Sequence, residues 1–187
     1  MVVLLGWFGS ILYLVNHAYI SVVKNWQPSI YYMGNLFAAL ALVVSSLIIV
    51  SYQAVVINGF WAIISVLLII KIDLAKVPLS KRIFYLGFAL FLIYSAYIGF
   101  EQRFNSYDFY TSLGWSSSYV FCLSYLLFCS KKLKHINYLL LNFYAASALL
   151  PILWIQQNWP VFTLEVSWAL ISAYGAYKRM DEVHLID

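Results

Sequence analysis

The polar side chains that could perform chemistry in this chain stand inside long apolar stretches. Glu165 is the only acidic residue well inside such a stretch, and its carboxyl group could bind a solute through hydrogen bonds or carry a proton. Trp168 and Ser172 follow it at i+3 and i+7, so the three side chains share one face if the segment is helical. The same spacing of a polar residue, an indole and a hydroxyl occurs earlier in the chain, at Asn58, Trp61 and Ser65.

A polar group beside an indole suits a ligand that combines hydrogen-bonding groups with a flat apolar surface. A structural interpretation is also open, because a buried carboxylic acid can hydrogen-bond between helices, small residues let helices approach closely, and Trp fills space. Asn35 and Asn142 are further candidates for contact with a solute. An Asn inside an apolar helix more often bonds a neighbouring helix, so these two residues carry both interpretations.

The composition restricts the class of protein. Of the 187 residues, 64% are apolar and 10% are charged, whereas a soluble domain has about 45–50% and about 25%. This excludes an ordinary globular enzyme, a disordered chain and a nucleic-acid-binding protein, despite the net charge of +4. The sequence contains no phosphate-binding loop, nucleophile elbow or paired catalytic carboxylates. We therefore expect no enzymatic activity, no metal and no cofactor.

The apolar stretches have the length of membrane-spanning helices. A helix needs about 20 mainly apolar residues to cross the hydrocarbon core of a bilayer. Seven segments meet this requirement, at Leu4–Val23, Ser29–Val50, Ala54–Ile70, Ile83–Phe100, Thr111–Ser130, Ile136–Ile155 and Pro160–Tyr177.

The basic residues give the orientation of these spans. If the N-terminus lies outside, every Lys and Arg except Arg103 falls in an inner loop or in the C-terminal tail, from Lys24 in the first loop to Lys178 and Arg179 near the end. This is the asymmetry that the positive-inside rule predicts. We therefore expect the N-terminus outside and the C-terminus in the cytoplasm.

Three short blocks recur in order along the chain. Asn35–Ala39 recurs as Asn142–Ala146, and Asn58–Ser65 recurs as Glu165–Ser172. The number of residues between the two copies is the same in both cases, and we call it the repeat offset. The remaining block, Leu5–Ser10, returns as Leu113–Ser118, one position later than this offset would place it. Blocks in this order at a nearly constant spacing indicate an internal duplication.

The duplication determines the predicted fold. Each repeat, at 4–73 and 111–178, contains three spans, and the span at 81–100 has no counterpart. Because three is odd, this extra crossing lets both repeats keep the same orientation. The prediction is an all-α integral membrane protein with seven transmembrane helices, in which a linker helix joins two parallel three-helix repeats and a short cytoplasmic tail follows at 179–187.

This 3+1+3 plan resembles the SWEET sugar transporters and their half-size bacterial SemiSWEET relatives in the PQ-loop group. The most specific local similarity is Asn158-Trp159-Pro160, followed five residues after the proline by Glu165. It resembles the SemiSWEET pattern in which a proline precedes the substrate-binding asparagine by five residues. Asn58 occupies the matching place in the first repeat, so the resemblance implies that Asn58 and Glu165 face a central cavity.

The chain departs from this group in its first helices, because the Pro-Gln pair that names the group is absent from both 4–23 and 111–130. The plan is also similar to that of the vitamin-precursor transporters of the PnuC type. The chain looks closer to the bacterial inner-membrane proteins with SWEET-like repeats, which implies a location in a bacterial inner membrane.

The sequence thus predicts a transporter or facilitator of a small polar or partly aromatic metabolite, either sugar-like or vitamin-precursor-like. The solute would pass through a central cavity between two triple-helix bundles. The alternative is a non-transporting membrane scaffold or assembly protein that retains this fold. The expected partners are the lipid bilayer and a small-molecule solute, with no nucleic acid, and the chain is expected to be a monomer or a weak homo-oligomer.

Overall fold

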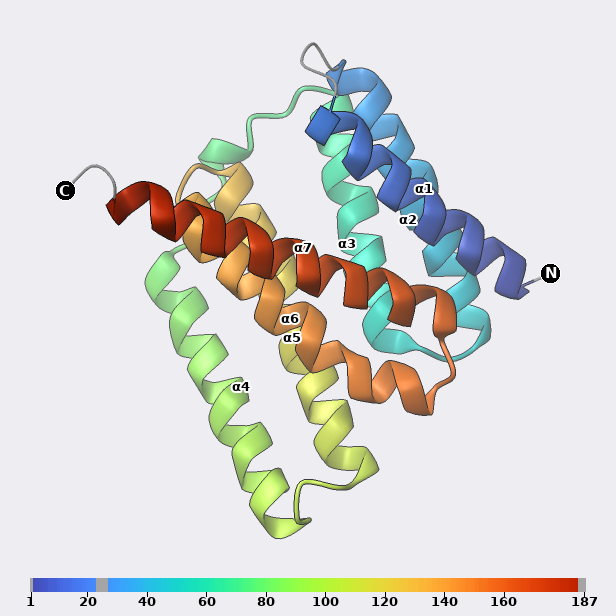
Figure 1. Cartoon of the computed structure of the whole chain (residues 1–187), viewed down its shortest axis with the longest axis vertical. Coiled ribbons are helices and arrows are strands. Elements are labelled where there is room, and N and C mark those ends of the chain that lie inside the picture. The colour runs from blue at the N-terminus through green and yellow to red at the C-terminus, as the bar shows by residue number, and fades with distance from the viewer. Residues whose placement is uncertain (1, 23–26, 185–187) are drawn as a thin grey trace. The chain divides into compact units, whose positions relative to one another are not determined.

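The computed structural model describes residues 2–22 and 27–184, without the side chains of residues 17, 18, 20–22 and 180–184. Within these ranges the chain is entirely helical, with seven α-helices, one short 3₁₀ helix and no strand (Figure 1). The elements are α1 (Val2–Val22), α2 (Pro28–Ile48), α3 (Tyr52–Ile69), η1 (Leu74–Lys76), α4 (Lys81–Glu101), α5 (Tyr107–Cys129), α6 (His135–Ile155) and α7 (Trp159–His184). Lys24, which the charge argument places in an inner loop, lies outside the described residues.

Each of the seven predicted spans falls on one α-helix, so the predicted positions of the helices are confirmed. Five helices, α2 to α6, are long and apolar enough to cross a membrane. In α1 the described apolar stretch, Val2–Asn16, is shorter, and α7 does not belong to the five. Helix α7 also continues to His184, so most of the predicted tail at 179–187 is helical.

Left-handed residues close five of the helices. Arg103 and Phe104 have φ of 55° and follow α4. Val50, Lys71, Lys131 and Gln157 have φ between 54° and 60° and follow α2, α3, α5 and α6. The next amide turns back to a carbonyl near the helix end, as in Ser51 N to Ser46 O at 2.8 Å and Asn158 N to Leu153 O at 3.0 Å. This is the Schellman arrangement, which satisfies carbonyl groups that a helix end leaves open.

The helices of the two predicted repeats have matching bounds. The repeat offset, which takes Asn35 to Asn142, also takes both ends of α2, Pro28 and Ile48, to the two ends of α6. The same offset takes the last residue of α1 to that of α5 and the first residue of α3 to that of α7. It also relates Val50 to Gln157, the left-handed residues that close α2 and α6.

The chain divides into two compact units, each of which is described by itself. Unit 1 comprises Met1–Asp73 and Leu153–Leu164, and unit 2 comprises Leu74–Ile152 and Glu165–Asp187. In unit 1, α2 packs against both α1 and α3. Gly9 allows a close approach of α1 to α2, because a Cβ atom there would lie 2.8 Å from Leu42 Cγ and 3.0 Å from the Ala38 carbonyl oxygen. Small residues at such a contact are typical of helices packed in membranes.

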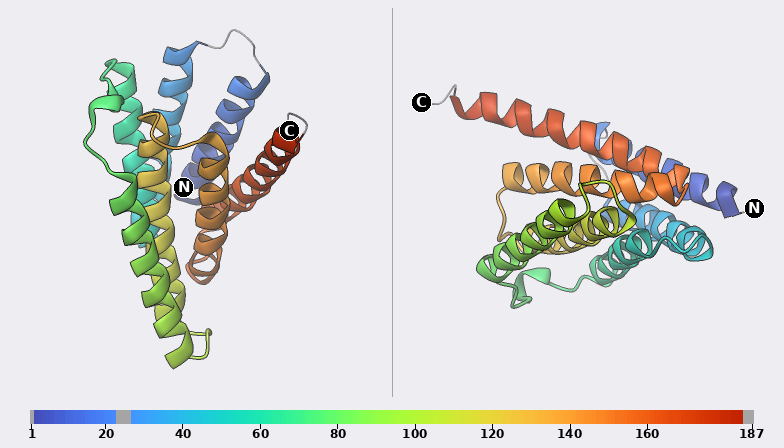
Figure 2. Two further views of the ribbon diagram at one scale, coloured as in Figure 1. Left: turned by 90° about the vertical axis from the view of Figure 1, so that its left-hand side faces the viewer. Right: turned by 90° about the horizontal axis from the view of Figure 1, so that it is seen from below.

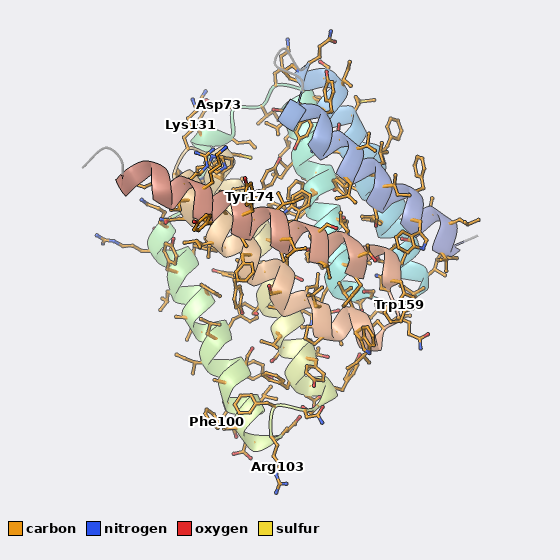
Figure 3. All side chains as sticks on the ribbon, in the orientation of Figure 1. Asp73, Phe100, Arg103, Lys131, Trp159 and Tyr174 are labelled. Atoms are coloured by element: carbon orange, nitrogen blue, oxygen red, sulfur yellow. The ribbon has the colours of Figure 1, made fainter. Side chains whose placement is uncertain are left out.

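In unit 2, α4 and α5 run side by side (Figure 2). Tyr119 of α5 donates a hydrogen bond to the Phe84 carbonyl oxygen at 3.1 Å, and the two rings stack at 5.8 Å. Ser117 donates to the Ala145 carbonyl at 2.7 Å, which joins α5 to α6. Arg103 and Lys131 follow the C-terminal ends of α4 and α5 and lie at opposite ends of this helix pair (Figure 3).

Candidate functional site

In α3, the predicted site residues are buried and form hydrogen bonds within their own helix. Asn58 Nδ2 donates to the Ala54 carbonyl at 2.8 Å, and Ser65 Oγ donates to the Trp61 carbonyl at 2.8 Å. Both are bonds to the residue four positions earlier, which short polar side chains commonly form in apolar helices. The Trp61 ring meets Tyr13 of α1 edge to face, with ring centroids 6.1 Å apart.

Asn35 of α2 is part of a polar contact with α1. Asn16 Nδ2 donates to Asn35 Oδ1 at 2.7 Å and to the Tyr31 carbonyl at 2.8 Å. Gly34 makes room for this contact, because a Cβ atom there would lie 2.8 Å from Asn16 Oδ1. Asn35 Nδ2 is buried and has no hydrogen-bond partner, so a donor remains available inside unit 1.

Glu165 of α7 is buried in unit 2, with 6% of its surface exposed. Its Oε2 atom is inaccessible and has no hydrogen-bond partner. A carboxyl oxygen without a partner is costly in an apolar interior, where burying a polar group without compensation costs about 1–3 kcal/mol on protein scales. Such an atom needs a specific explanation, and a ligand or a transferred proton is one.

The structure brings together two predicted site residues of unit 2. Trp168 Nε1 of α7 donates to Asn142 Oδ1 of α6 at 3.1 Å, and Asn142 Nδ2 donates to the Tyr138 carbonyl at 2.7 Å. Trp168 is three residues after Glu165, so the indole and the carboxyl group share a face of α7. Ser172, one turn further along, is also buried.

Asn58 belongs to unit 1 and Glu165 to unit 2. The predicted cavity between these two residues is therefore a proposal rather than an observation. Trp61 contacts an aromatic ring, and Trp168 bonds an amide.

Sequence reasoning missed a polar network at two turns that both belong to unit 1. Ser51 Oγ donates to Gln156 Oε1 at 2.5 Å, and Gln156 Nε2 donates to Gln53 Oε1 at 3.4 Å. The nearby Ser10 Oγ donates to the Pro160 carbonyl at 2.9 Å. The repeat offset relates the α2–α3 turn to the α6–α7 turn, which could have marked these turns as a pair.

The described residues contain no group of three or more His, Cys, Asp or Glu side chains that could hold a metal ion. Cys122 and Cys129 are free thiols of α5. The buried site residues described above can form hydrogen bonds through amides, hydroxyls, an indole and the Glu165 carboxyl group.

These features define an all-helical protein in which five helices are long and apolar enough to cross a membrane. A family model matches residues 2–76 and 110–182, which make up most of the chain, and the chain belongs to that family. The two matched segments are nearly equal in length and leave out the region that contains α4. No curated protein and no solved structure matches the chain.

Proposed function

We propose that the chain is an integral membrane protein with seven spans, its N-terminus outside and its C-terminus in the cytoplasm. The lengths and apolar character of α2 to α6 support this proposal. Helix α4 supports it further, because it leaves large apolar side chains uncovered over its whole length, as at Ile83, Leu90 and Phe100. Contiguous apolar surface of this kind is expected where a helix faces lipid.

The proposed plan is two parallel three-helix repeats, at 4–73 and 111–178, joined by a linker helix at 81–100. The constant offset between the bounds of α2 and α6 supports the duplication. The family match supports it as well, because its two segments nearly coincide with the proposed repeats and flank the linker. Duplicated membrane folds commonly bind their solute at the interface between the repeats.

The proposed activity is transport of a small polar or partly aromatic metabolite, sugar-like or vitamin-precursor-like. The observation that carries this proposal is the buried Glu165 carboxyl oxygen without a hydrogen-bond partner. Ionisable groups inside membrane helices are costly, and they usually face a cavity or mark a path for ions, protons or solutes. In this proposal Glu165 binds the solute or carries a coupled proton, and the Asn142–Trp168 pair positions a ring or a hydroxyl group beside it.

Uptake into proteoliposomes tests the proposal. The panel contains radiolabelled hexoses, disaccharides and nucleoside-type vitamin precursors. We expect at least one solute to enter faster than into empty liposomes, and we expect Glu165→Gln to reduce that uptake at least about tenfold. The matched control is Glu101→Gln at the exposed end of α4, which removes the same charge and leaves uptake unchanged. If Glu101→Gln reduced uptake as much as Glu165→Gln does, the assigned role of Glu165 would be wrong.

A second candidate function, a non-transporting scaffold, is favoured by the bonds in α3. Asn58 and Ser65 both donate to carbonyls of their own helix, as residues with a purely structural role do. If the chain is a scaffold, no solute enters proteoliposomes that contain the wild type or Asn58→Ala faster than it enters empty liposomes. Crosslinking in native membranes then captures one constant protein partner. Uptake that Asn58→Ala reduces would instead favour transport.

A further inference from the structure

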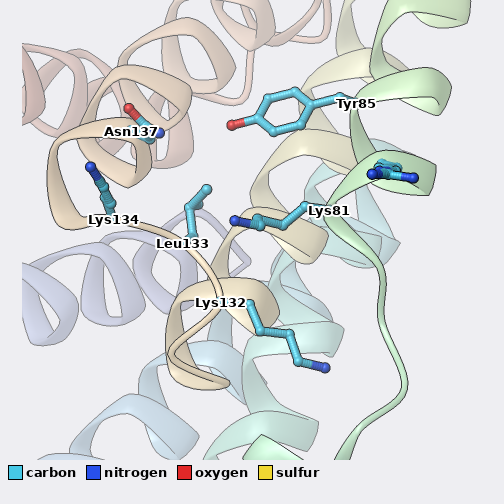
Figure 4. Close-up of a pocket in the computed structure, with 7 residues that line it drawn as sticks. Lys81, Tyr85, Lys132, Leu133, Lys134 and Asn137 are labelled. Atoms are coloured by element: carbon cyan, nitrogen blue, oxygen red, sulfur yellow. The ribbon is translucent and has the colours of Figure 1, made fainter.

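A basic pocket of about 500 Å³ lies in unit 2, at the end where α4 and α6 begin (Figure 4). Lys81 and Arg82 line it from the first turn of α4. Lys132 and Lys134 line it from the segment between α5 and α6. Among the side chains that the structure describes, those that line this pocket include four basic groups and no acidic one.

Three hydrogen bonds from the segment between α5 and α6 hold the wall of the pocket in place. Lys132 Nζ donates to the Val77 carbonyl at 2.6 Å and to the Leu79 carbonyl at 3.3 Å. Ser130 Oγ donates to the Leu74 carbonyl at 2.8 Å. These bonds fasten the segment before α4 to the segment after α5, so the pocket is formed without a ligand.

The remaining lining residues suit a phosphate group. Tyr85 and Asn137 add a phenol and an amide, which can both donate hydrogen bonds to phosphate oxygens. The N-termini of α4 and α6 begin beside the pocket, at Lys81 and His135, and helix N-termini favour anions. Charge-assisted hydrogen bonds from Lys and Arg to phosphate are shorter and stronger than neutral ones.

An apolar stripe of α4 begins at the pocket. Leu86, Leu90 and Ile93 follow Arg82 at i+4, i+8 and i+11, and these positions lie on one side of a helix. All three apolar side chains are exposed. A lipid with its headgroup in the pocket could therefore lay its acyl chains along α4, whereas a free phosphate ion would leave this stripe unused.

We propose that this pocket binds the phosphate headgroup of an anionic phospholipid at the cytoplasmic surface, with the acyl chains against the apolar stripe of α4. This inference rests on the proposed membrane location and not on transport. Basic pockets between membrane helices on the cytoplasmic side are known to hold anionic headgroups, and each Lys or Arg near such a surface contributes about 1 kcal/mol.

The test measures lipid binding by the full chain in neutral detergent at about 0.15 M salt, where exposed charges more than about 8 Å apart are largely screened. Phosphatidylglycerol, phosphatidylcholine and glycerol 3-phosphate are titrated separately, with native mass spectrometry as the readout. We expect phosphatidylglycerol to bind the wild type, and K81Q/R82Q to bind it about 30-fold more weakly. K134Q, at an exposed lining residue, is a milder variant with an expected loss of about fivefold.

The matched control is K71Q/K76Q, which removes two exposed positive charges that do not line the pocket. We expect this variant to bind phosphatidylglycerol within about twofold of the wild type. Equal losses in both double variants would overturn the proposal in favour of general attraction between the lipid and basic loops. Equal binding of glycerol 3-phosphate would also overturn it, because the pocket would then be a site for soluble phosphate esters.

The outcome is separable from that of the transport proposal. Glu165→Gln leaves the pocket unchanged, so this variant is expected to bind phosphatidylglycerol as the wild type does. If the protein binds the lipid but moves no solute, the proposed pocket is supported and the proposed transport function is wrong. If it moves a solute but does not bind the lipid, only the proposed pocket is wrong.

Discussion

Gly9 and Gly59 allow one substitution, Gly to Ala, to be compared in two different packing environments within unit 1. At Gly9 the added Cβ atom would lie 2.8 Å from Leu42 Cγ and 3.0 Å from the Ala38 carbonyl oxygen. The second of these atoms belongs to the backbone of α2, so relief requires α1 and α2 to move apart. At Gly59 the added Cβ atom would meet no atom within 4 Å.

The expected free energies of unfolding follow from two effects. Replacing Gly by Ala inside a helix stabilises it by about 0.8–1 kcal/mol at either position. The methyl group added at Gly9 overpacks the contact between α1 and α2, which destabilises the protein by about 1–3 kcal/mol. No such cost arises at Gly59. We therefore expect Gly59→Ala to stabilise the protein by about 1 kcal/mol and Gly9→Ala to destabilise it by up to about 2 kcal/mol.

Thermal unfolding in detergent, followed by far-ultraviolet circular dichroism, measures the difference between the two variants. For a chain of this length 1 kcal/mol corresponds to about 2–4 °C, so the unfolding midpoints should differ by about 2–12 °C with Gly9→Ala the lower. Equal midpoints, or a higher midpoint for Gly9→Ala, would refute the close approach of α1 and α2 at Gly9.

Three further changes test other parts of the fold by the same unfolding measurement. Ser51→Ala removes the 2.5 Å bond to Gln156 and should destabilise by about 1 kcal/mol, because a partly buried bond between two turns is lost. Asn142→Ala should destabilise by about 0.6–1.7 kcal/mol. This loss should be smaller in a Trp168→Phe background, where the indole donor is already absent and only the bond from Asn142 to the Tyr138 carbonyl remains to be lost. Val50→Gly should stabilise by up to about 1 kcal/mol, because Val50 has φ of 60° and its side chain is exposed.

Controls separate these effects from nonspecific damage. Ser29→Ala, at an exposed serine at the start of α2, should leave the midpoint unchanged. Ile49→Gly, one residue before Val50 and with an ordinary φ of −94°, should lower the midpoint rather than raise it. If glycine had the same effect at both positions, the left-handed turn after α2 would not explain the gain.

Much of the fold could be predicted from local sequence, because a membrane-length helix is a local structure. Each of the seven predicted spans falls on a helix, and the short break between Ile155 and Pro160 was predicted from a few polar residues. The apolar content fails to identify α7 as a span by length and composition, since polar and charged residues interrupt it. The helical state of α7 is also predicted by the similarity of its sequence to that of α3.

The candidate site was predicted only in part. Glu165 was recognised as a buried carboxyl because an acidic residue is rare inside an apolar stretch, and its burial is observed. The pairing of Asn142 with Trp168 was not predicted, although both were candidates. The contact between Asn16 and Asn35 was not predicted either, because it depends on how closely Gly34 lets the Asn16 side chain approach α2.

The sequence by itself determined which segments are helical and which of them correspond across the repeat offset, but not that α7 continues to His184. These properties depend on hydrophobicity, turn chemistry and self-similarity along the chain. Only the tertiary structure decided which polar atoms are satisfied, for example that Asn58 bonds its own helix while a Glu165 oxygen has no partner. The physical reason is that hydrogen bonding and close packing depend on small differences in distance between helices, and residue spacing along one helix does not specify those distances.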